Sequence, residues 1–405
     1  MIQDFVNKHF YSLFIITLIF GIVTYGLIGF QSIDELCGIV LFIMFIHYMF
    51  HTSDWRINKI FIYILGIFIF YLIYSFQINS NSQKAILVDF IIQLKPYIAF
   101  FCVYQIKPLF NKKQNILLNQ LCLLCWGLLA PFGIIELFYP NMLKLIAGHP
   151  SNYASAIAAL ALVYLYTSNN SNKEKIIFIC MLTVGLFSAR SKFYGFFVLS
   201  VFSILFFSNA KNLKFNFKNA FIALIMLGII FLVAKEKIEL YFLQGISANS
   251  EKDYIARFAL YATSFLIFKD YFPFGSGLAT FGTHASGAYY SNIYKEYEID
   301  GIWGLSKHYP YFISDTYYPS LAQFGVVGAL LFVVFWIYLC KKAYTYFKVT
   351  YDSKLTTIVI IISGYFAIEN IADATFTSNR GLFFMMFLGL VFSNMTRNTN
   401  QKEIL

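Results

Sequence analysis

The sequence predicts an all-α polytopic membrane protein with about twelve transmembrane helices and one long loop on the outer side of the membrane. The first observation behind this prediction is composition, because 59% of the 405 residues are hydrophobic and only 12% are charged. A soluble domain carries about 25% charged residues, so this chain has too few to cover a water-exposed surface. The second observation is a series of apolar runs near the length of about 20 residues that crosses a bilayer. A soluble globular protein is excluded.

Twelve apolar stretches, each bounded by polar clusters, define the predicted helices. They comprise residues 10–30, 36–50, 58–78, 85–105, 116–138, 152–168, 175–190, 193–208, 219–236, 316–340, 355–376 and 380–395. Only the short polar run from Ser188 to Lys192 separates the seventh stretch from the eighth. The helices leave no room for a large water-facing domain. The whole chain, residues 1–405, is therefore predicted to form a single membrane domain.

The distribution of positive charge predicts the orientation. One set of loops holds most of the lysines, whereas the short loops of the alternate set hold few. The cations of this second set are Lys84, Lys144, Arg190, Lys192 and Arg380. By the positive-inside rule both termini are cytoplasmic, which agrees with an even number of spans. The net charge of +10 is scattered along the chain, which suits contact with anionic membrane lipids and argues against a nucleic-acid partner.

Residues 237–315 form the single long loop, and the predicted orientation places this loop outside. An aromatic stripe recurs in it at three- and four-residue spacing, which is typical of one face of a helix. Its members are Phe258, Tyr261, Phe265, Phe268 and Phe272. The uncharged part of this segment is too short to span a bilayer. We therefore expect short interfacial helices in this loop.

The polar residues that remain candidates for chemistry gather at the outer ends of the predicted helices. They are Arg190 and Lys192 in the hairpin, Arg257 at the start of the aromatic stripe, His149 and Asn152 before the sixth stretch, Gly275 and Gly277 after the stripe, and His308 and Asp315 before the tenth stretch. No Walker loop, HExxH, GxSxG or Rossmann motif occurs in the chain. No cofactor and no metal are expected.

Each candidate has two interpretations. Arg190 and Arg257 are either interfacial anchors that reach lipid headgroups or clamps for a phosphate. His308 is either a surface residue or a general base, and Asp315 is either a helix N-cap or a base, two roles that can coexist. The run from Gly275 to Gly277 is either a turn or a backbone that a ligand approaches closely.

Other charged residues bear on the same question. Asp34 and Glu35 in the first outer loop are either metal ligands or solvated charges. Glu369 and Asp373, four residues apart, share one face of a helix and are placed to balance Arg190 or Arg380. Asp89 and Lys95 lie within the fourth stretch, where intramembrane charge is a functional hint, here for a proton or ion path.

Four motifs resemble those of the Wzy-type O-antigen and capsule polymerases and, more distantly, the O-antigen ligases, which are bacterial inner-membrane enzymes of the glycosyltransferase-C type. They are Gly148-His-Pro-Ser-Asn152, Arg190 in Phe-Ser-Ala-Arg-Ser, Arg257 followed by Pro273-Phe-Gly-Ser-Gly277, and the run from Ser314 to Gly328. The ligases carry a His-Asn pair where this last run begins. Here Ser314 and Asp315 occupy that place and His308 lies six residues upstream of Ser314, which favours a polymerase over a ligase.

The resemblance implies a glycosyltransferase-C-like fold in the bacterial inner membrane, with the long loop in the periplasm. It implies transfer of an undecaprenyl-diphosphate-linked glycan onto a hydroxyl of a second lipid-linked repeat unit, with release of undecaprenyl diphosphate. In this scheme Arg190 and Arg257 bind the diphosphate, Asp315 or His308 accepts the hydroxyl proton, and no nucleotide takes part. The partners implied are both lipid-linked glycans and membrane lipids, and binding of a chain-length regulator protein stays open.

Three alternatives remain at this point. A flippase for lipid-linked oligosaccharide also has about twelve helices, although such transporters usually show internal repeats that are not seen here. An O-antigen ligase is the second alternative. The third is a metal-dependent glycosyltransferase that uses Asp34 and Glu35.

Overall fold

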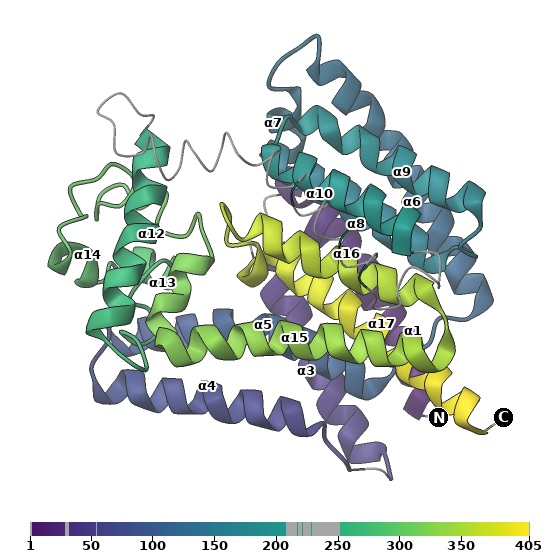
Figure 1. Cartoon of the computed structure of the whole chain (residues 1–405), viewed down its shortest axis with the longest axis horizontal. Helices are drawn as coiled ribbons and strands as arrows, with labels where there is room; N and C mark the ends of the chain where they lie inside the picture. Colours follow the sequence, from purple (N-terminus) through teal and green to yellow (C-terminus); the bar gives the residue numbers. More distant parts are fainter. Residues whose placement is uncertain are drawn as a thin grey trace.

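The computed structural model describes residues 2–28, 32–53, 55–207, 217, 221, 228 and 252–404, and no strand occurs in these ranges (Figure 1). The longer helices are α1 (Ile2–Leu18), α3 (Ile33–His51), α4 (Lys59–Gln77), α5 (Gln83–Ile106), α6 (Lys112–Glu136), α8 (Pro150–Thr167), α9 (Asn172–Gly185), α10 (Ser191–Phe202), α12 (Lys252–Asp270), α15 (Gly325–Thr350), α16 (Ser353–Glu369) and α17 (Asn379–Ile404). Short helices are α2 (Tyr25–Ile28), α7 (Met142–Ala147), α13 (His284–Ala288) and α14 (Ile293–Glu296). The π-helical segments are η1 (Ile19–Val23) and η3 (Ser203–Phe207), and the 3₁₀ helices are η2 (Leu186–Ser188), η5 (Tyr318–Phe324) and η6 (Thr375–Thr377).

The described part of the chain confirms the all-α polytopic class. Each of the other eleven predicted stretches is helical over most of its length, whereas the stretch 219–236 lies outside the described residues except for Phe221 and Gly228. Within the described ranges, six helical segments are long and apolar enough to cross a membrane. They are Ile2–Val23, Ile33–His51, Lys59–Gln77, Gln83–Ile106, Lys112–Glu136 and Tyr318–Thr350. The helix α15 runs ten residues past the predicted end at 340, because residues 341–350 contain no Gly or Pro that would end it.

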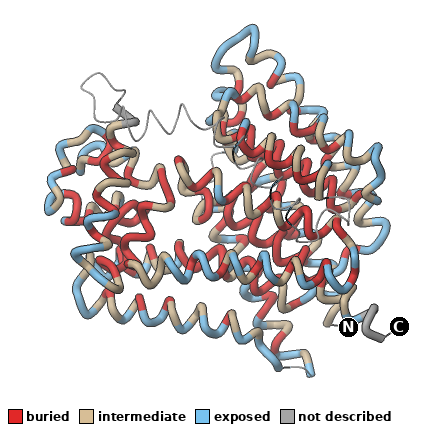
Figure 2. The backbone as a smooth tube through the Cα atoms, viewed as in Figure 1, coloured by how far each residue is buried: buried red, intermediate tan, exposed pale blue. Residues whose placement is uncertain are grey.

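The centre of the helical body is the contact between α5 and α17, with α8 beside it. Almost every residue of α8 is buried, as Figure 2 shows for the middle of the molecule. Small side chains permit this close approach. In α8 they are the alanines at 154, 156, 158, 159 and 161, and in α17 Gly389 faces the Phe100 carbonyl so closely that a Cβ would lie 2.5 Å from its oxygen.

The outward faces of α3, α4, α6 and α15 are apolar and exposed (Figure 2). Leu124 and Leu128 of α6 are 61% and 63% exposed, and Ile337 of α15 is 59% exposed. Exposed apolar surface on this scale is expected of helices that face lipid tails. It agrees with the membrane assignment from composition.

The helix ends gather into two groups on opposite ends of the body. At one end the Gln3 amide and the Arg397 guanidinium both donate to the Lys107 carbonyl, at 3.1 Å each, so the first and last helices begin and end side by side (Figure 1). Both termini therefore lie at the same end of the body, as an even number of spans requires. The other end carries the loops with few cations and the segment 252–315.

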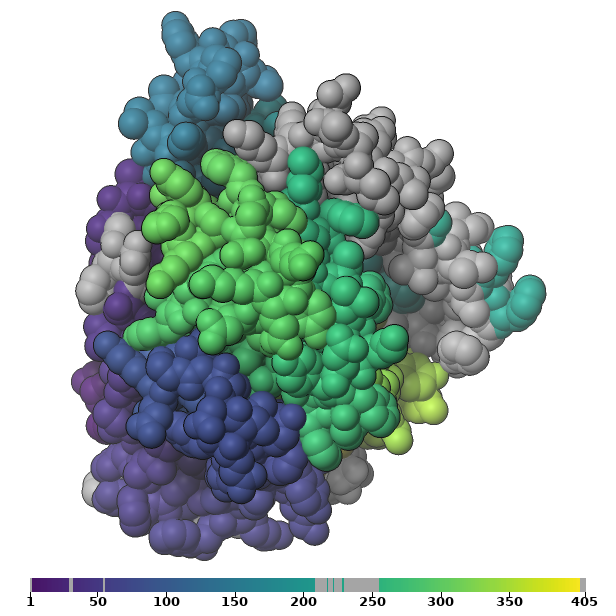
Figure 3. All heavy atoms as spheres, turned by 90° about the vertical axis from the view of Figure 1, so that its left-hand side faces the viewer, coloured from purple at the N-terminus to yellow at the C-terminus, as the bar shows by residue number. Residues whose placement is uncertain are grey.

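Residues 252–315 form a compact unit with a core of their own, built from buried side chains that include Leu260, Phe281 and Tyr294. Figure 3 shows this unit in green, covering one face next to residues of α4 and α5. Hydrogen bonds fix it there, because Tyr74 Oη donates to the Gly275 carbonyl at 2.9 Å and Asn81 Nδ2 donates to the Ala279 carbonyl at 2.8 Å. Helices α12, α13 and α14 lie in this unit, which rests on the ends of the helical body, whereas residues 237–251 of the predicted loop lie outside the described residues.

Candidate functional site

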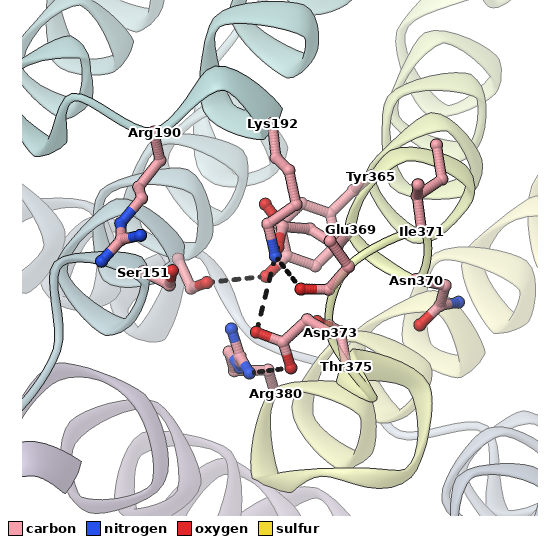
Figure 4. Close-up of polar contacts among 12 residues, drawn as sticks. Ser151, Arg190, Lys192, Tyr365, Glu369, Asn370, Ile371, Asp373, Thr375 and Arg380 are labelled. Carbon is pink, nitrogen blue, oxygen red and sulfur yellow. Dashed lines mark hydrogen bonds and ion pairs between the residues drawn. The ribbon is translucent and has the colours of Figure 1, made fainter. Parts of the chain in front are cut away.

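A cluster of four charged side chains joins α10, α16 and α17 (Figure 4). Lys192 Nζ lies 2.9 Å from Glu369 Oε2 and 3.6 Å from Asp373 Oδ2. Arg380 Nη2 donates to Asp373 Oδ1 at 2.7 Å. We call these four residues the ion cluster. Two cations and two carboxylates balance one another in it, which offsets part of the cost of burying them.

Local sequence places each member of the ion cluster at a helix end. Ala189 has a left-handed backbone (φ 51°) that ends η2 and turns the chain, so that Lys192 falls in the first turn of α10. Glu369 ends α16, and Arg380 lies in the first turn of α17. The turn between them is held by Asn370, whose side-chain oxygen accepts the Phe376 N–H at 3.0 Å.

Arg190 lies beside the ion cluster and contacts His149, with Nη2 and Nε2 at 3.0 Å (Figure 4 shows the position of Arg190). His149 is the N-cap of α8, where its Nδ1 accepts the Ser151 N–H at 3.2 Å. Partial desolvation of the ring, and next the charge of Arg190, lower the pKa of His149 to about 4. The imidazole is therefore neutral near pH 7.

The tautomer of His149 has a chemical consequence. Because Nδ1 accepts a backbone hydrogen bond, the proton of the neutral ring resides on Nε2. Arg190 Nη2 lies 3.0 Å from Nε2 and can only donate, so the neutral ring cannot accept hydrogen bonds from both Ser151 and Arg190. Two donors that converge in this way are both satisfied by an oxyanion. Asn152 lies nearby in α8 and donates from Nδ2 to the Ala147 carbonyl at 3.0 Å.

Arg257 and Asp315 form a second ion pair within the loop unit. Arg257 Nε donates to Asp315 Oδ2 at 2.8 Å, Nη2 contacts the same oxygen, and the guanidinium lies over the Phe312 ring at 5.7 Å. Burial, reinforced by the charge of Asp373, outweighs the opposing charge of Arg257 and raises the pKa of Asp315. A carboxylate with a raised pKa is a stronger base than an ordinary one.

Two hydrogen bonds connect this second pair to the ion cluster. Tyr261 Oη, one turn after Arg257 in α12, donates to the Ile371 carbonyl at 2.7 Å. The Tyr317 N–H, two residues after Asp315, donates to the Asn370 carbonyl at 3.1 Å. The loop unit thus contacts the turn that carries Asp373, and Asp315 comes within range of the charges of Lys192 and Asp373.

The remaining predicted residues have other surroundings. His308 is exposed in the loop. Gly275 and Gly277 are buried with positive φ angles, and a Cβ on Gly275 would lie 2.2 Å from the Gly325 nitrogen, so close packing accounts for a glycine there. Arg190 and Arg257, which were expected to grip one diphosphate together, each pair with a different neighbour, His149 and Asp315.

Buried charge also occurs away from this site. Lys95 contacts Asp34, and its Nζ lies 3.1 Å from Glu35 Oε1, so both carboxylates of the first outer loop share a cation of α5. Asp89 accepts the Ala279 N–H at 2.8 Å and so ties α5 to the loop unit. Among the described residues, no group of three His, Cys, Asp or Glu side chains is placed to hold a metal ion.

Sequence reasoning identified Lys192 as a site residue and Glu369 and Asp373 as counter-charges, but it did not place Arg380 in the site. The available signal was its position, seven residues after Asp373 and directly before the apolar run of α17. A charged side chain at that position can be buried only if a residue of opposite charge contacts it. Which partner does so depends on helix packing.

Comparison with known families adds an independent observation. A family model described as O-antigen ligase matches residues 175–333. These residues include Arg190, Lys192, Arg257 and Asp315, and exclude His149, Asp373 and Arg380. No curated protein matches the chain. The chain is thus similar, over less than half of its length, to proteins of the O-antigen ligase family.

Proposed function

We propose that the protein polymerises lipid-linked oligosaccharide repeat units at the periplasmic face of the inner membrane. The donor is an undecaprenyl-diphosphate-linked glycan, and the acceptor is a sugar hydroxyl of a second lipid-linked unit. The observation that carries this proposal is the convergence of the Arg190 and His149 donors next to the ion cluster, with the basic Asp315 carboxylate close by. An anion site beside a base is what displacement of a diphosphate requires.

In the proposed reaction the acceptor hydroxyl oxygen attacks the anomeric carbon of the donor. A new glycosidic C–O bond forms while the bond from that carbon to the diphosphate oxygen breaks, with inversion. The hydroxyl proton passes to the Asp315 carboxylate, and Arg257 holds that carboxylate in place. Arg190 and the Nε2–H of His149 stabilise the charge that develops on the leaving diphosphate. His308 is exposed in the loop and has no part in this scheme.

A groove in the helical body supports a lipid-linked substrate. It has a volume of about 1020 Å³ between α4 and α15, and its walls are almost entirely apolar. Its lining includes Phe68, Tyr71, Tyr97, Tyr317 and Phe335. Tyr317 lies two residues from Asp315, so this groove begins close to the proposed base. A polyprenyl chain matches an apolar groove of this kind.

The test replaces Arg190 by Ala and, separately, by Lys, and displays the lengths of the surface glycan on gels. Both variants are expected to lose long chains, because removing one donor to a developing oxyanion costs about 100- to 1000-fold in rate, and Lys lacks the directed guanidinium N–H groups. Lys144→Ala, an exposed cation at the same end of the body, is the control. Unchanged long chains in both Arg190 variants would remove Arg190 from the mechanism.

An O-antigen ligase is the second candidate, which the description of the matching family favours. Deletion of the protein separates the two functions. Loss of a polymerase leaves a single repeat unit on the acceptor, whereas loss of a ligase leaves none. The polymerase proposal expects the single unit.

A further inference from the structure

Arg380 has donors that the protein does not satisfy. The residue is only 8% exposed, and its Nη2 is held by Asp373 at 2.7 Å. Its Nε and Nη1 are also buried, and neither has a hydrogen-bond partner among the residues that the structure describes. Buried donors are nearly always paired, because leaving one unpaired costs about 1 to 3 kcal/mol and more when the group is charged. Two such nitrogens, which together carry three N–H groups on one guanidinium, therefore indicate an acceptor that binds there.

The position of Arg380 shows where this acceptor would lie. In Figure 4 the side chains of Arg190 and Arg380, which come from different helices, extend toward the same region, with Ser151 beside it. Arg190 Nη2 lies 3.0 Å from His149 Nε2, and the charge of Arg380 also lowers the pKa of His149. The ion pair with Asp373, itself in contact with Lys192, fixes the direction of the Arg380 guanidinium.

The balance of charge in the ion cluster and at Arg190 indicates the chemical class of the ligand. Lys192 and Arg380 are matched by Glu369 and Asp373 within the ion cluster, whereas Arg190 contacts a neutral imidazole. The region thus has an excess of positive charge and an excess of N–H donors. A ligand that supplies several anionic oxygens meets both requirements, and a diphosphate does so.

We propose that Arg380 is a substrate-binding residue whose Nε–H and Nη1–H donate to the diphosphate of the lipid-linked donor, opposite Arg190. This inference rests on the proposed function and changes one part of it. The second guanidinium at the diphosphate is Arg380 of α17, and Arg257 instead orients Asp315. Anchoring by Asp373 makes Arg380 a rigid donor, so little conformational entropy is lost when the ligand binds.

The test measures binding of inorganic pyrophosphate and of a polyprenyl diphosphate to the purified protein in detergent, by calorimetry. Arg380→Lys keeps the charge beside Asp373 and therefore the fold, but it lacks the planar fork of N–H groups. We expect the Kd for both probes to rise about tenfold to one hundredfold, because each hydrogen bond to a charged group is worth about 1.5 to 3 kcal/mol. Arg397→Lys, the same substitution at the opposite end of α17, is the control and should leave both Kd values unchanged.

Thermal unfolding of each variant shows whether a loss of binding is only a loss of structure. Arg380→Lys is expected to unfold close to the wild-type temperature and still to bind weakly. Should it bind both probes as tightly as wild type while Arg190→Gln loses them, the role of Arg380 is overturned and the proposed function stands. Should wild type bind neither probe, the proposed function fails together with this inference.

Discussion

Two groups of buried charge in this protein differ in sign, and the difference indicates where an anionic substrate binds. At the contact of α3 with α5, one cation, Lys95, meets two carboxylates, Asp34 and Glu35. At the contact of α10 with α16 and α17, the ion cluster is balanced within itself, and Arg190 adds a further positive charge beside it. The first group has an excess of negative charge and repels a diphosphate. Only the second has cationic donors to spare.

The two groups also differ in what surrounds them. Asp34 and Lys95 are nearly inaccessible and hold two helices together. The ion cluster instead lies where three helix ends meet the loop unit, next to Asp315. A buried charge pair contributes to structure at the first place, whereas at the second it also orients groups toward a substrate.

The largest effect is expected for Asp315, beside the ion cluster. Asp315→Asn removes the proposed base and should lower the rate of glycosyl transfer by about 100- to 10,000-fold with little effect on folding. In wild type only the ionised carboxylate accepts a proton, so the rate should fall as the pH decreases. Because the pKa of Asp315 is raised, this fall should begin at a higher pH than for an ordinary carboxyl group.

His149 supplies the control for that pH profile, measured as initial transfer rate against pH. Its pKa is lowered to about 4, so it stays neutral from pH 5 to pH 8 and contributes no step there. The His149→Gln variant is expected to transfer glycan more slowly than wild type at every pH. The pH at which its rate falls on acidification should be the same as in wild type. If the fall of the rate at low pH shifts or disappears in His149→Gln, the group that titrates is His149 and not Asp315.

Lys95→Met should have the largest effect on stability. It leaves Asp34 buried without its cation, and breaking a buried pair in this way costs about 3 to 5 kcal/mol. The loss is measured as a lower midpoint of thermal unfolding in detergent, against Lys113→Met at the exposed start of α6. The molecules that remain folded should keep their binding of the donor. Loss of donor affinity at full stability would mean that the first group also contacts substrate.

Lys192→Met should show the reverse pattern. Asp373 keeps its ion pair with Arg380, whereas Glu369 loses its cation and the Ala372 carbonyl loses a donor, and the expected loss of stability is smaller, about 1 to 3 kcal/mol. Transfer should slow on the order of tenfold, since one cation near the leaving group is removed. Equal losses of stability in the Lys95 and Lys192 variants would contradict the distinction between the two groups.

Tyr261→Phe is expected to have the smallest effect. It removes one hydrogen bond between the loop unit and the Ile371 carbonyl, which is worth about 0.5 to 1.5 kcal/mol. Hydrogen exchange should increase in the turn after α16 and remain unchanged around Asp34. Equal exchange in wild type and variant at both places would show that this bond does not hold the loop unit on the ion cluster.

Many residues of the site could be predicted individually from the sequence, but their contacts with one another could not. Arg257 and Asp315 are both recognisable in sequence, because polar residues at the edges of apolar runs are few. Their pairing is not recognisable, since Asp315 follows Arg257 by 58 positions along the chain. Gly275 and Gly277 resemble a ligand-binding turn in sequence, yet both are buried against other segments of the protein.

The sequence by itself determined that this chain is helical and lies in a membrane, because apolar runs of bilayer length admit no other structure that satisfies their backbone hydrogen bonds internally and leaves no strand edge in lipid. It also determined which loops are poor in cations. Only the tertiary structure decided that Lys192, Glu369, Asp373 and Arg380 meet, and that Lys95 is committed elsewhere. The physical reason is that hydropathy acts on each segment separately, whereas an ion pair between distant segments depends on how the helices pack.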